Sequence, residues 1–156
     1  MRRPIRFGKP PRQGVAAVEF ALALPLFTII LLGVWELGRL VDVQQILDNA
    51  AREGGRQAST GLASSSQVQQ TVLNYLSLAG INTTGAVVTV SDLTSPGTDP
   101  TLAGQLDQVQ VTVTIPSDNV RWVLLNSLTG ITELRASSIW NSMNDLPVNV
   151  SSSIPQ

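Results

Sequence analysis

The sequence contains no cysteine and no histidine among its 156 residues. The absence of these two residue types excludes the usual zinc sites, a thiol nucleophile and the histidine-dependent catalytic triads. It also excludes a framework of internal disulfides, although it does not reveal the compartment of the protein. The single lysine, Lys9, lies near the start of the chain, so the many serines have no nearby base to activate them. We therefore expect no enzyme, no cofactor and no metal site.

Charged residues are scarce, at 13% of the chain, and they are nearly balanced, with 10 Lys+Arg against 11 Asp+Glu. A net charge of -1 argues against a nucleic-acid-binding protein, which would carry a basic face over the whole domain. The average hides an asymmetry, because residues 1–12 hold five of the basic residues and no acidic one. The remaining 144 residues carry 5 basic and 11 acidic residues, which gives a net charge of -6.

A long apolar stretch follows the basic residues. Residues 15–40 read VAAVEFALALPLFTIILLGVWELGRL, and the only polar side chain in the uncharged centre, Phe20–Trp35, is Thr28. A bilayer core of about 30 Å needs about 20 helical residues, which Val15–Trp35 supplies if Glu19 lies near one border. The alternative, a buried helix of a soluble protein, would need a polar stripe that this stretch lacks. We therefore expect a transmembrane helix over residues 15–40.

The five cations before the apolar stretch predict its orientation, with the N-terminus in the cytoplasm and the chain from about residue 41 exported. Apolar residues recur beyond the stretch at spacings of three, four and seven, which predicts that the helix continues as an amphipathic helix. We expect it to end near Gly54–Gly55, where paired glycines weaken a helix. This continuation argues against an ordinary cleaved secretory signal. Pro25 predicts a kink or a loosened hydrogen bond.

Two carboxylates stand near the borders of the apolar stretch. A carboxylate inside the apolar border is energetically costly, so Glu19 is expected to have a partner or a functional role. The alternative is that its side chain simply reaches the lipid headgroups. Glu36 lies 17 residues further on, about 25 Å along a helix, so the two cannot act as an acid/base pair. Arg39 follows Glu36 by three residues, which predicts an ion pair at the membrane border.

The exported part shows one helical pattern and three strand patterns. Residues 65–78 predict a second helix with Ser66 as its N-cap and with Val68, Val72, Tyr75 and Leu76 on one face. Residues 86–90, 108–115 and 133–140 predict strands. The second of these alternates cleanly and places Val109, Val111, Val113 and Ile115 on one face. The predicted fold class is α+β: a long N-terminal transmembrane helix continuing into an amphipathic helix, a second helix, and a small antiparallel sheet of about three strands.

Several other residues have a structural and a functional interpretation. Asp92 and Asp99 flank a turn-rich connection, where they either cap turns or bind Ca²⁺, and the missing calcium-loop spacing favours capping. Trp122 and Trp140 are either exposed binding residues or core residues, and the core role is the commoner one. Residues 151–156 are expected to form a loose tail.

The residues around Glu19 resemble a known family. Gly14-Val-Ala-Ala-Val-Glu19-Phe20 resembles the processing site of type IV prepilins, closest to the tight-adherence (Tad) branch. The longer stretch, to about Ala58, resembles TadE-like pseudopilins. The matching features are Glu19-Phe20, Leu24-Pro25, Glu36-Leu-Gly-Arg39 and Asn49-Ala-Ala-Arg-Glu-Gly54. The resemblance implies that a prepilin peptidase cuts between Gly14 and Val15, and that Glu19 becomes the fifth residue of the processed chain.

The resemblance also implies a function. The chain is expected to be a single-pass protein of the bacterial inner membrane and a minor pseudopilin that takes part in assembly of a Tad-type pilus or a related secretion apparatus, with Glu19 and Phe20 serving processing and assembly. Its expected partners are the prepilin peptidase, other pilins and pilus assembly proteins, and no nucleic acid or small-molecule substrate. The resemblance implies that Glu19 pairs with the terminal amine of a neighbouring subunit. The alternative is a pair with the amine of Val15 in its own chain.

The predicted organisation has four parts: a basic leader over residues 1–14, the transmembrane helix over 15–40, an exported domain over 41–150 and the tail. An alternative function with the same N-terminal segment is a membrane-anchored exported binding or scaffold protein unrelated to a pilus. TadF-like and TadG-like proteins share this segment, so the subtype stays open, although the short exported domain favours TadE.

Overall fold

The computed structural model describes residues 13–120, 130 and 132–144. Residues 1–12 of the predicted leader, Trp122 and the predicted tail lie outside the described residues. The elements, in chain order, are α1 (Gln13–Ser59), α2 (Ser65–Leu78), β1 (Val87–Asp92), η1 (Pro100–Leu102), β2 (Gln108–Pro116), η2 (Ser117–Asn119) and β3 (Glu133–Asn141). The structure confirms the predicted α+β fold with a long apolar N-terminal helix, a second helix and a three-stranded antiparallel sheet.

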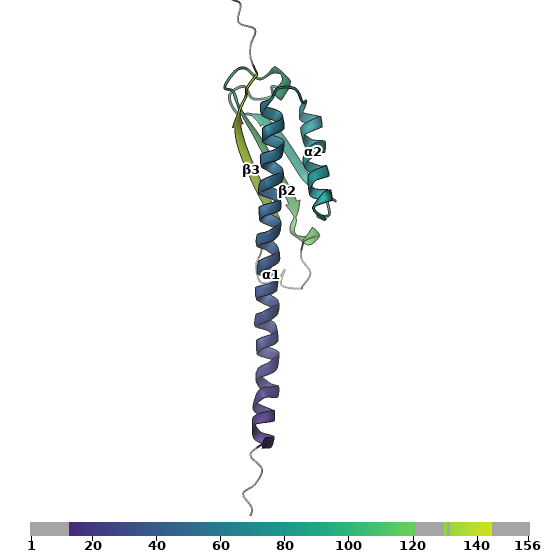
Figure 1. The fold of residues 1–156 in the computed structure, drawn as a ribbon, viewed down its shortest axis with the longest axis vertical. Helices are drawn as coiled ribbons and strands as arrows, with labels where there is room; N and C mark the ends of the chain where they lie inside the picture. Colours follow the sequence, from purple (N-terminus) through teal and green to yellow (C-terminus); the bar gives the residue numbers. More distant parts are fainter. Residues whose placement is uncertain (1–12, 121–129, 131, 145–156) are drawn as a thin grey trace, which may run out of the picture.

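Helix α1 is the axis of the molecule. Its 47 residues form one uninterrupted helix about 70 Å long. Figure 1 shows that its N-terminal half projects away from the rest of the chain, whereas its C-terminal half lies against α2 and the sheet. The buried residues of that half recur at helical spacing and include Val43, Leu47 and Ala50. One helix therefore joins an exposed apolar segment to the core of a folded domain.

The predicted end of this helix at Gly54–Gly55 is wrong, because α1 continues to Ser59. A Cβ atom on Gly54 would lie 2.6 Å from Val72 Cγ2 and 3.1 Å from Val111 Cγ1. A Cβ atom on Gly55 would lie 2.6 Å from Trp140 Nε1. The two glycines thus lie where α1 packs tightly against α2 and the sheet, and the surrounding packing keeps the helix intact in spite of their low propensity.

Helix α2 has the predicted bounds, but its N-cap is Ser64 and not Ser66. The Ser64 hydroxyl accepts from the backbone N–H of Gln67, and the Gln67 side chain accepts from the backbone N–H of Ser64 at 2.9 Å. This reciprocal capping box satisfies two N–H groups that the first turn leaves free. Val68, Val72 and Leu76 are buried as predicted, whereas Tyr75 is 37% exposed at the edge of the same face.

The sheet has the strand order β1-β2-β3, and both pairs are antiparallel. The four alternating β2 residues predicted to share a face, namely Val109, Val111, Val113 and Ile115, are all fully buried. Val113 lies between Val88 of β1 and Ala136 of β3, so the register brings apolar residues together on the face that contacts the helices. The opposite face is mostly polar, although Val87 and Ile139 are exposed on it. There, Gln110 and Thr112 both donate to the hydroxyl of Ser137.

Asp92 and Asp99 cap turns, as favoured by the sequence. Asp92 Oδ1 accepts from the backbone N–H groups of Thr94 and Ser95, both at 2.8 Å. Asp99 caps η1 and also accepts from the backbone N–H of Ser65, the first residue of α2, at 2.9 Å. Asp99 therefore links the connection between β1 and β2 to the start of α2 by a hydrogen bond.

This capping predicts how stability depends on pH. The hydrogen bond from the Ser65 N–H, followed by those from Thr101, lowers the pKa of Asp99 to about 2. Because the pKa is lower in the folded state, the stabilisation is complete above the unfolded pKa, near 4, and is lost as the pH falls toward 2. We expect Asp99→Asn to remove this part of the pH dependence of unfolding. At neutral pH, Asp99→Ala should lower the free energy of unfolding by about 1 kcal/mol.

Denaturant titrations at pH 7, 4 and 2.5 measure both effects. Glu133→Gln, at an exposed position at the start of β3, is the control for the loss of one negative charge. If wild type and Asp99→Asn lose equal stability between pH 4 and pH 2.5, the carboxylate of Asp99 does not stabilise the folded state.

Candidate membrane-spanning and assembly segment

The N-terminal half of α1 is an exposed apolar rod. Its large apolar side chains, from Val15 to Val41, face outward along the whole length of the segment. The most apolar 18-residue window has a mean hydropathy of 2.4, and none of that window is buried inside the structure. By length and composition, α1 is the one helix of the described part of the chain that is able to cross a membrane. These properties support membrane anchoring through α1.

The four residues of the predicted processing and assembly site lie at the free end of this rod. Gly14, Val15, Glu19 and Phe20 are in the first turns of α1 and are exposed. Glu19 is four positions after Val15, so the two residues share one face of the helix about one turn apart. Among the described residues, no ion pair joins Glu19 to another side chain. The site therefore stands apart from the folded domain.

The rod contains one proline and one polar side chain, and the helix accommodates both. Pro25 lies inside α1, and the helix continues on both sides of it. Pro25 has no N–H group, so the carbonyl four residues earlier, that of Ala21, loses its usual helical donor. The hydroxyl of Thr28 donates to the backbone carbonyl of Leu24 at 2.9 Å. The single polar side chain of the uncharged centre is thus satisfied without a partner helix or water.

The predicted ion pair between Glu36 and Arg39 does not form in the structure. Arg39 Nη1 instead lies 3.0 Å from Asp42 Oδ2, and the Asp42 side chain is 58% exposed. Glu36 is only 4% exposed, and among the described residues neither of its carboxylate oxygens has a hydrogen-bond partner. Arg39 can reach an acid three residues before or after it, and in the structure it pairs with the exposed one, Asp42, whereas Glu36 is buried.

The burial of Glu36 predicts an unusual mutational result. A buried carboxyl group without a partner lowers stability by about 1–3 kcal/mol. Methionine has a similar length and no hydrogen-bonding requirement, so we expect Glu36→Met to raise the free energy of unfolding by an amount in this range. Thermal unfolding of the full chain in detergent measures the effect, with Asp42→Met as a control at an exposed site. A melting temperature below that of wild type would show that Glu36 has a stabilising partner.

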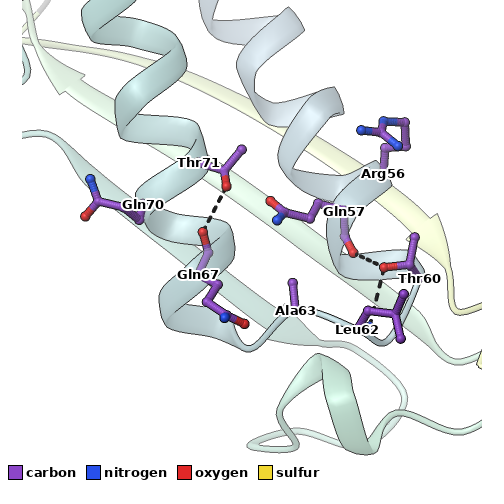
Figure 2. Close-up of a pocket in the computed structure, with 8 residues that line it drawn as sticks. All are labelled: Arg56, Gln57, Thr60, Leu62, Ala63, Gln67, Gln70 and Thr71. Atoms are coloured by element: carbon purple, nitrogen blue, oxygen red, sulfur yellow. Dashed lines mark hydrogen bonds between the residues drawn. The ribbon is translucent and has the colours of Figure 1, made fainter.

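A second candidate site is the hollow of about 560 Å³ between the end of α1 and the start of α2. Figure 2 shows its lining by Arg56, Gln57, Thr60, Leu62, Ala63, Gln67, Gln70 and Thr71. Thr60 and Thr71 donate to helix carbonyls, whereas the side-chain oxygen of Gln57 is buried without a partner among the described residues. Arg56 forms two hydrogen bonds with Glu53, which lower the pKa of that carboxyl. The hollow pairs no nucleophile with a base.

Carboxylates are dispersed over the described residues. No three aspartates or glutamates in ranges 13–120 and 132–144 come close enough to share a metal ion.

Two features of the segment were not predicted from the sequence. The pairing of Arg39 with Asp42 had a signal, because an acid three residues away on either side is within reach. The role of Gly54 and Gly55 as contact residues had no local signal, since Val72, Val111 and Trp140, which approach them, are distant in the sequence.

Comparison with known proteins adds one match. The family model for TadE-like protein matches residues 14–56, which confirms the resemblance predicted from the motifs. The matched range begins at the predicted cleavage residue, covers the apolar rod and ends within the packed part of α1. No curated protein and no solved structure matches the chain. The match supports a role related to Tad pili, in the context of a membrane and of pilus assembly.

Proposed function

We propose that this chain, whose residues 14–56 match the TadE-like family, is a membrane-anchored minor pseudopilin that takes part in assembling a Tad-type pilus or a related secretion apparatus. The observation that carries the proposal is the division of α1. Its C-terminal half is built into a folded domain, and its N-terminal half is an unpartnered apolar rod that ends in the Gly14–Glu19 motif. In this role the chain acts by subunit contacts and carries out no reaction.

The rod has two uses in the proposed mechanism. In the inner membrane, with the N-terminus cytoplasmic and the domain exported, lipid tails cover its apolar side chains. During assembly the same side chains pack against the helices of other pilins, so extraction from the lipid does not expose them to water. The domain keeps its own core throughout, because the core residues that the structure describes begin at Val43 and lie in the C-terminal half of α1, in α2, in the sheet and in the segments that connect them.

Processing prepares the end of the rod for assembly. A peptidase that cuts after Gly14 removes the five cations of residues 1–12 and leaves a chain of 142 residues with a side-chain charge of -6. It also creates a positive amine on Val15, one turn from Glu19. Pairing of Glu19 with the amine of a neighbouring subunit lowers the cost of burying both charges. An unpaired carboxylate among apolar helices penalises every other alignment, so this pair fixes the axial register.

Affinity capture from gently solubilised membranes tests the proposal. We expect pilins or pseudopilins of a Tad system to be recovered with the full chain. The matched control is a chain in which another transmembrane helix replaces residues 15–35, so that the domain is still exported but lacks the rod. Recovery of non-pilin proteins alone, by both chains, would instead indicate an anchored scaffold or binding protein.

A further inference from the structure

A hollow of about 470 Å³ lies in the exported domain beside the C-terminal end of α1, at the opposite end of that helix from Gly14. It is lined by Gln105, Leu106, Trp140, Asn141, Ser142 and Met143. Two of the apolar side chains are largely uncovered: Leu106 is 69% exposed and Met143 is 62% exposed. The hollow therefore presents apolar surface to the outside of the molecule.

The walls of the hollow are held by backbone hydrogen bonds. The Leu106 N–H donates to the Ser142 carbonyl at 3.0 Å, and the Ser142 N–H donates to the Asp107 carbonyl at 2.7 Å. The Met143 N–H donates to the carbonyl of Ser59, the last residue of α1, at 2.8 Å. Both walls are thus fixed to each other and to α1, so the hollow is preformed and loses little conformational entropy when a partner binds.

Leu106 occupies a backbone position that suits glycine. Its φ is +66°, and within the described ranges it is the single non-glycine residue with a positive φ. It is the third residue of a turn that the hydrogen bond from the Asp107 N–H to the Gly104 carbonyl closes, at 3.2 Å. Turns with a positive φ at this position favour glycine or asparagine. A leucine here costs strain and, being exposed, gains little burial within its own chain.

The lining is uncharged, as a contact between identical copies requires. In a two-fold contact each copy offers the same surface, so a charged surface would meet its own charge and be repelled. The six lining residues carry no charge, although the chain beyond residue 14 has a net charge of -6. The hollow is therefore an uncharged site, lined by both polar and apolar side chains, on an otherwise acidic chain.

The membrane anchor places two copies correctly for such a contact. A second copy held in the same bilayer by the same α1 carries its hollow at the same height, beside Ser59 at the far end of the 46-residue stretch that begins at Gly14. Confinement to one membrane also raises the effective concentration of each copy for the other. A different subunit shares this match of height only if it has an anchor helix and domain of the same dimensions.

We propose that this hollow is the contact through which two copies of the chain pair side by side in the membrane. Leu106 of each copy enters the hollow of the other and packs between Trp140 and Met143. The contact adds the burial that Leu106 lacks in its own chain, and it removes the exposed apolar surface of both copies from water. The pairing requires only the anchored chain and goes beyond the role proposed for it in pilus assembly.

Cross-linking of the full chain in phosphatidylethanolamine/phosphatidylglycerol vesicles tests this pairing. The chain has no cysteine, so a single introduced cysteine reacts at one known place. We expect Gln105→Cys to give a covalent dimer with a short bis-maleimide at low protein density. Adding Leu106→Gly should reduce the cross-linked fraction about tenfold, as loss of a central interface side chain does. The melting temperature should stay equal or rise, because glycine relieves the strained turn.

Two controls separate pairing from collision and from unfolding. Leu78→Ala removes a leucine that is 90% exposed at the end of α2 and should leave the dimer unchanged. Ser77→Cys places the thiol on α2 and should give little dimer. Equal cross-linking at Ser77→Cys, no cross-linking at Gln105→Cys, or an undiminished dimer with Leu106→Gly would each overturn the proposal. Because the vesicles contain no other pilus protein, none of these results bears on the role in pilus assembly.

Discussion

Gly54→Ala is expected to destabilise the domain by about 1–3 kcal/mol, although alanine is the better helix former. The new Cβ atom would lie 2.6 Å from Val72 Cγ2, 3.1 Å from Val111 Cγ1 and 3.5 Å from Val68 Cγ1. All three valines are buried and β-branched, so their χ1 angles are stiff and no methyl group has free space to enter. Overpacking should therefore outweigh the propensity gain of roughly 1 kcal/mol.

The same helix supplies the matched control. A Cβ atom on Gly38 would have no heavy atom within 4 Å, so Gly38→Ala should gain the helix propensity of alanine without a clash. Urea unfolding of the purified chain in detergent compares the two variants directly. We expect their effects on the free energy of unfolding to have opposite signs. A stabilised Gly54→Ala would mean that α1 stands further from α2 and β2 than the structure shows.

Glu19→Ala should have the largest effect on function, with membrane insertion unchanged and pilus assembly largely lost. Insertion should survive because the substitution makes the rod more apolar. Assembly should fail because the amine of Val15 then has no carboxylate of a neighbouring subunit to pair with, and an unpaired buried charge costs several kcal/mol. The measurements are membrane fractionation of the variant and the amount of surface pili.

Two further variants separate pairing from other roles of Glu19. Glu19→Asp keeps the charge on a shorter side chain and should retain part of the activity, whereas Glu19→Gln keeps the shape and should behave like alanine. Processing must be scored in each variant, because Glu19 lies close to the cleavage site after Gly14. Wild-type piliation in a processed Glu19→Ala strain would exclude the pairing.

Periodicity was sufficient to predict the elements whose surroundings are simple. The alternation along β2 identified its four fully buried residues, because a strand with one face on a core has a period of two. The bounds of α2 followed from the helical spacing of Val68, Val72 and Leu76. In these segments local preference and tertiary packing favour the same structure.

Local rules failed where a distant segment decides the outcome. Gly54 and Gly55 have low helix propensity, yet α2 and β3 require their small size, and this requirement is not written in the neighbouring sequence. Arg39 had two acids within reach, and the choice of Asp42 depends on the burial of Glu36 by tertiary structure. Nothing in the residues Gly104 to Asp107 indicates that Leu106 takes a positive φ. For the processing and assembly site, motif resemblance carried the prediction, and the structure adds that its residues are exposed at the free end of α1.

The N-terminus of the mature protein tests the central claim most directly. The full chain is extracted from the membranes of cells with and without an active prepilin peptidase, and its intact mass and N-terminal peptide are determined by mass spectrometry. We predict a chain that begins at Val15 in the cells with the peptidase and a chain that retains residues 1–14 in the cells without it. An N-terminus that still carries residues 1–14 in cells whose peptidase processes another pilin would contradict the proposed function.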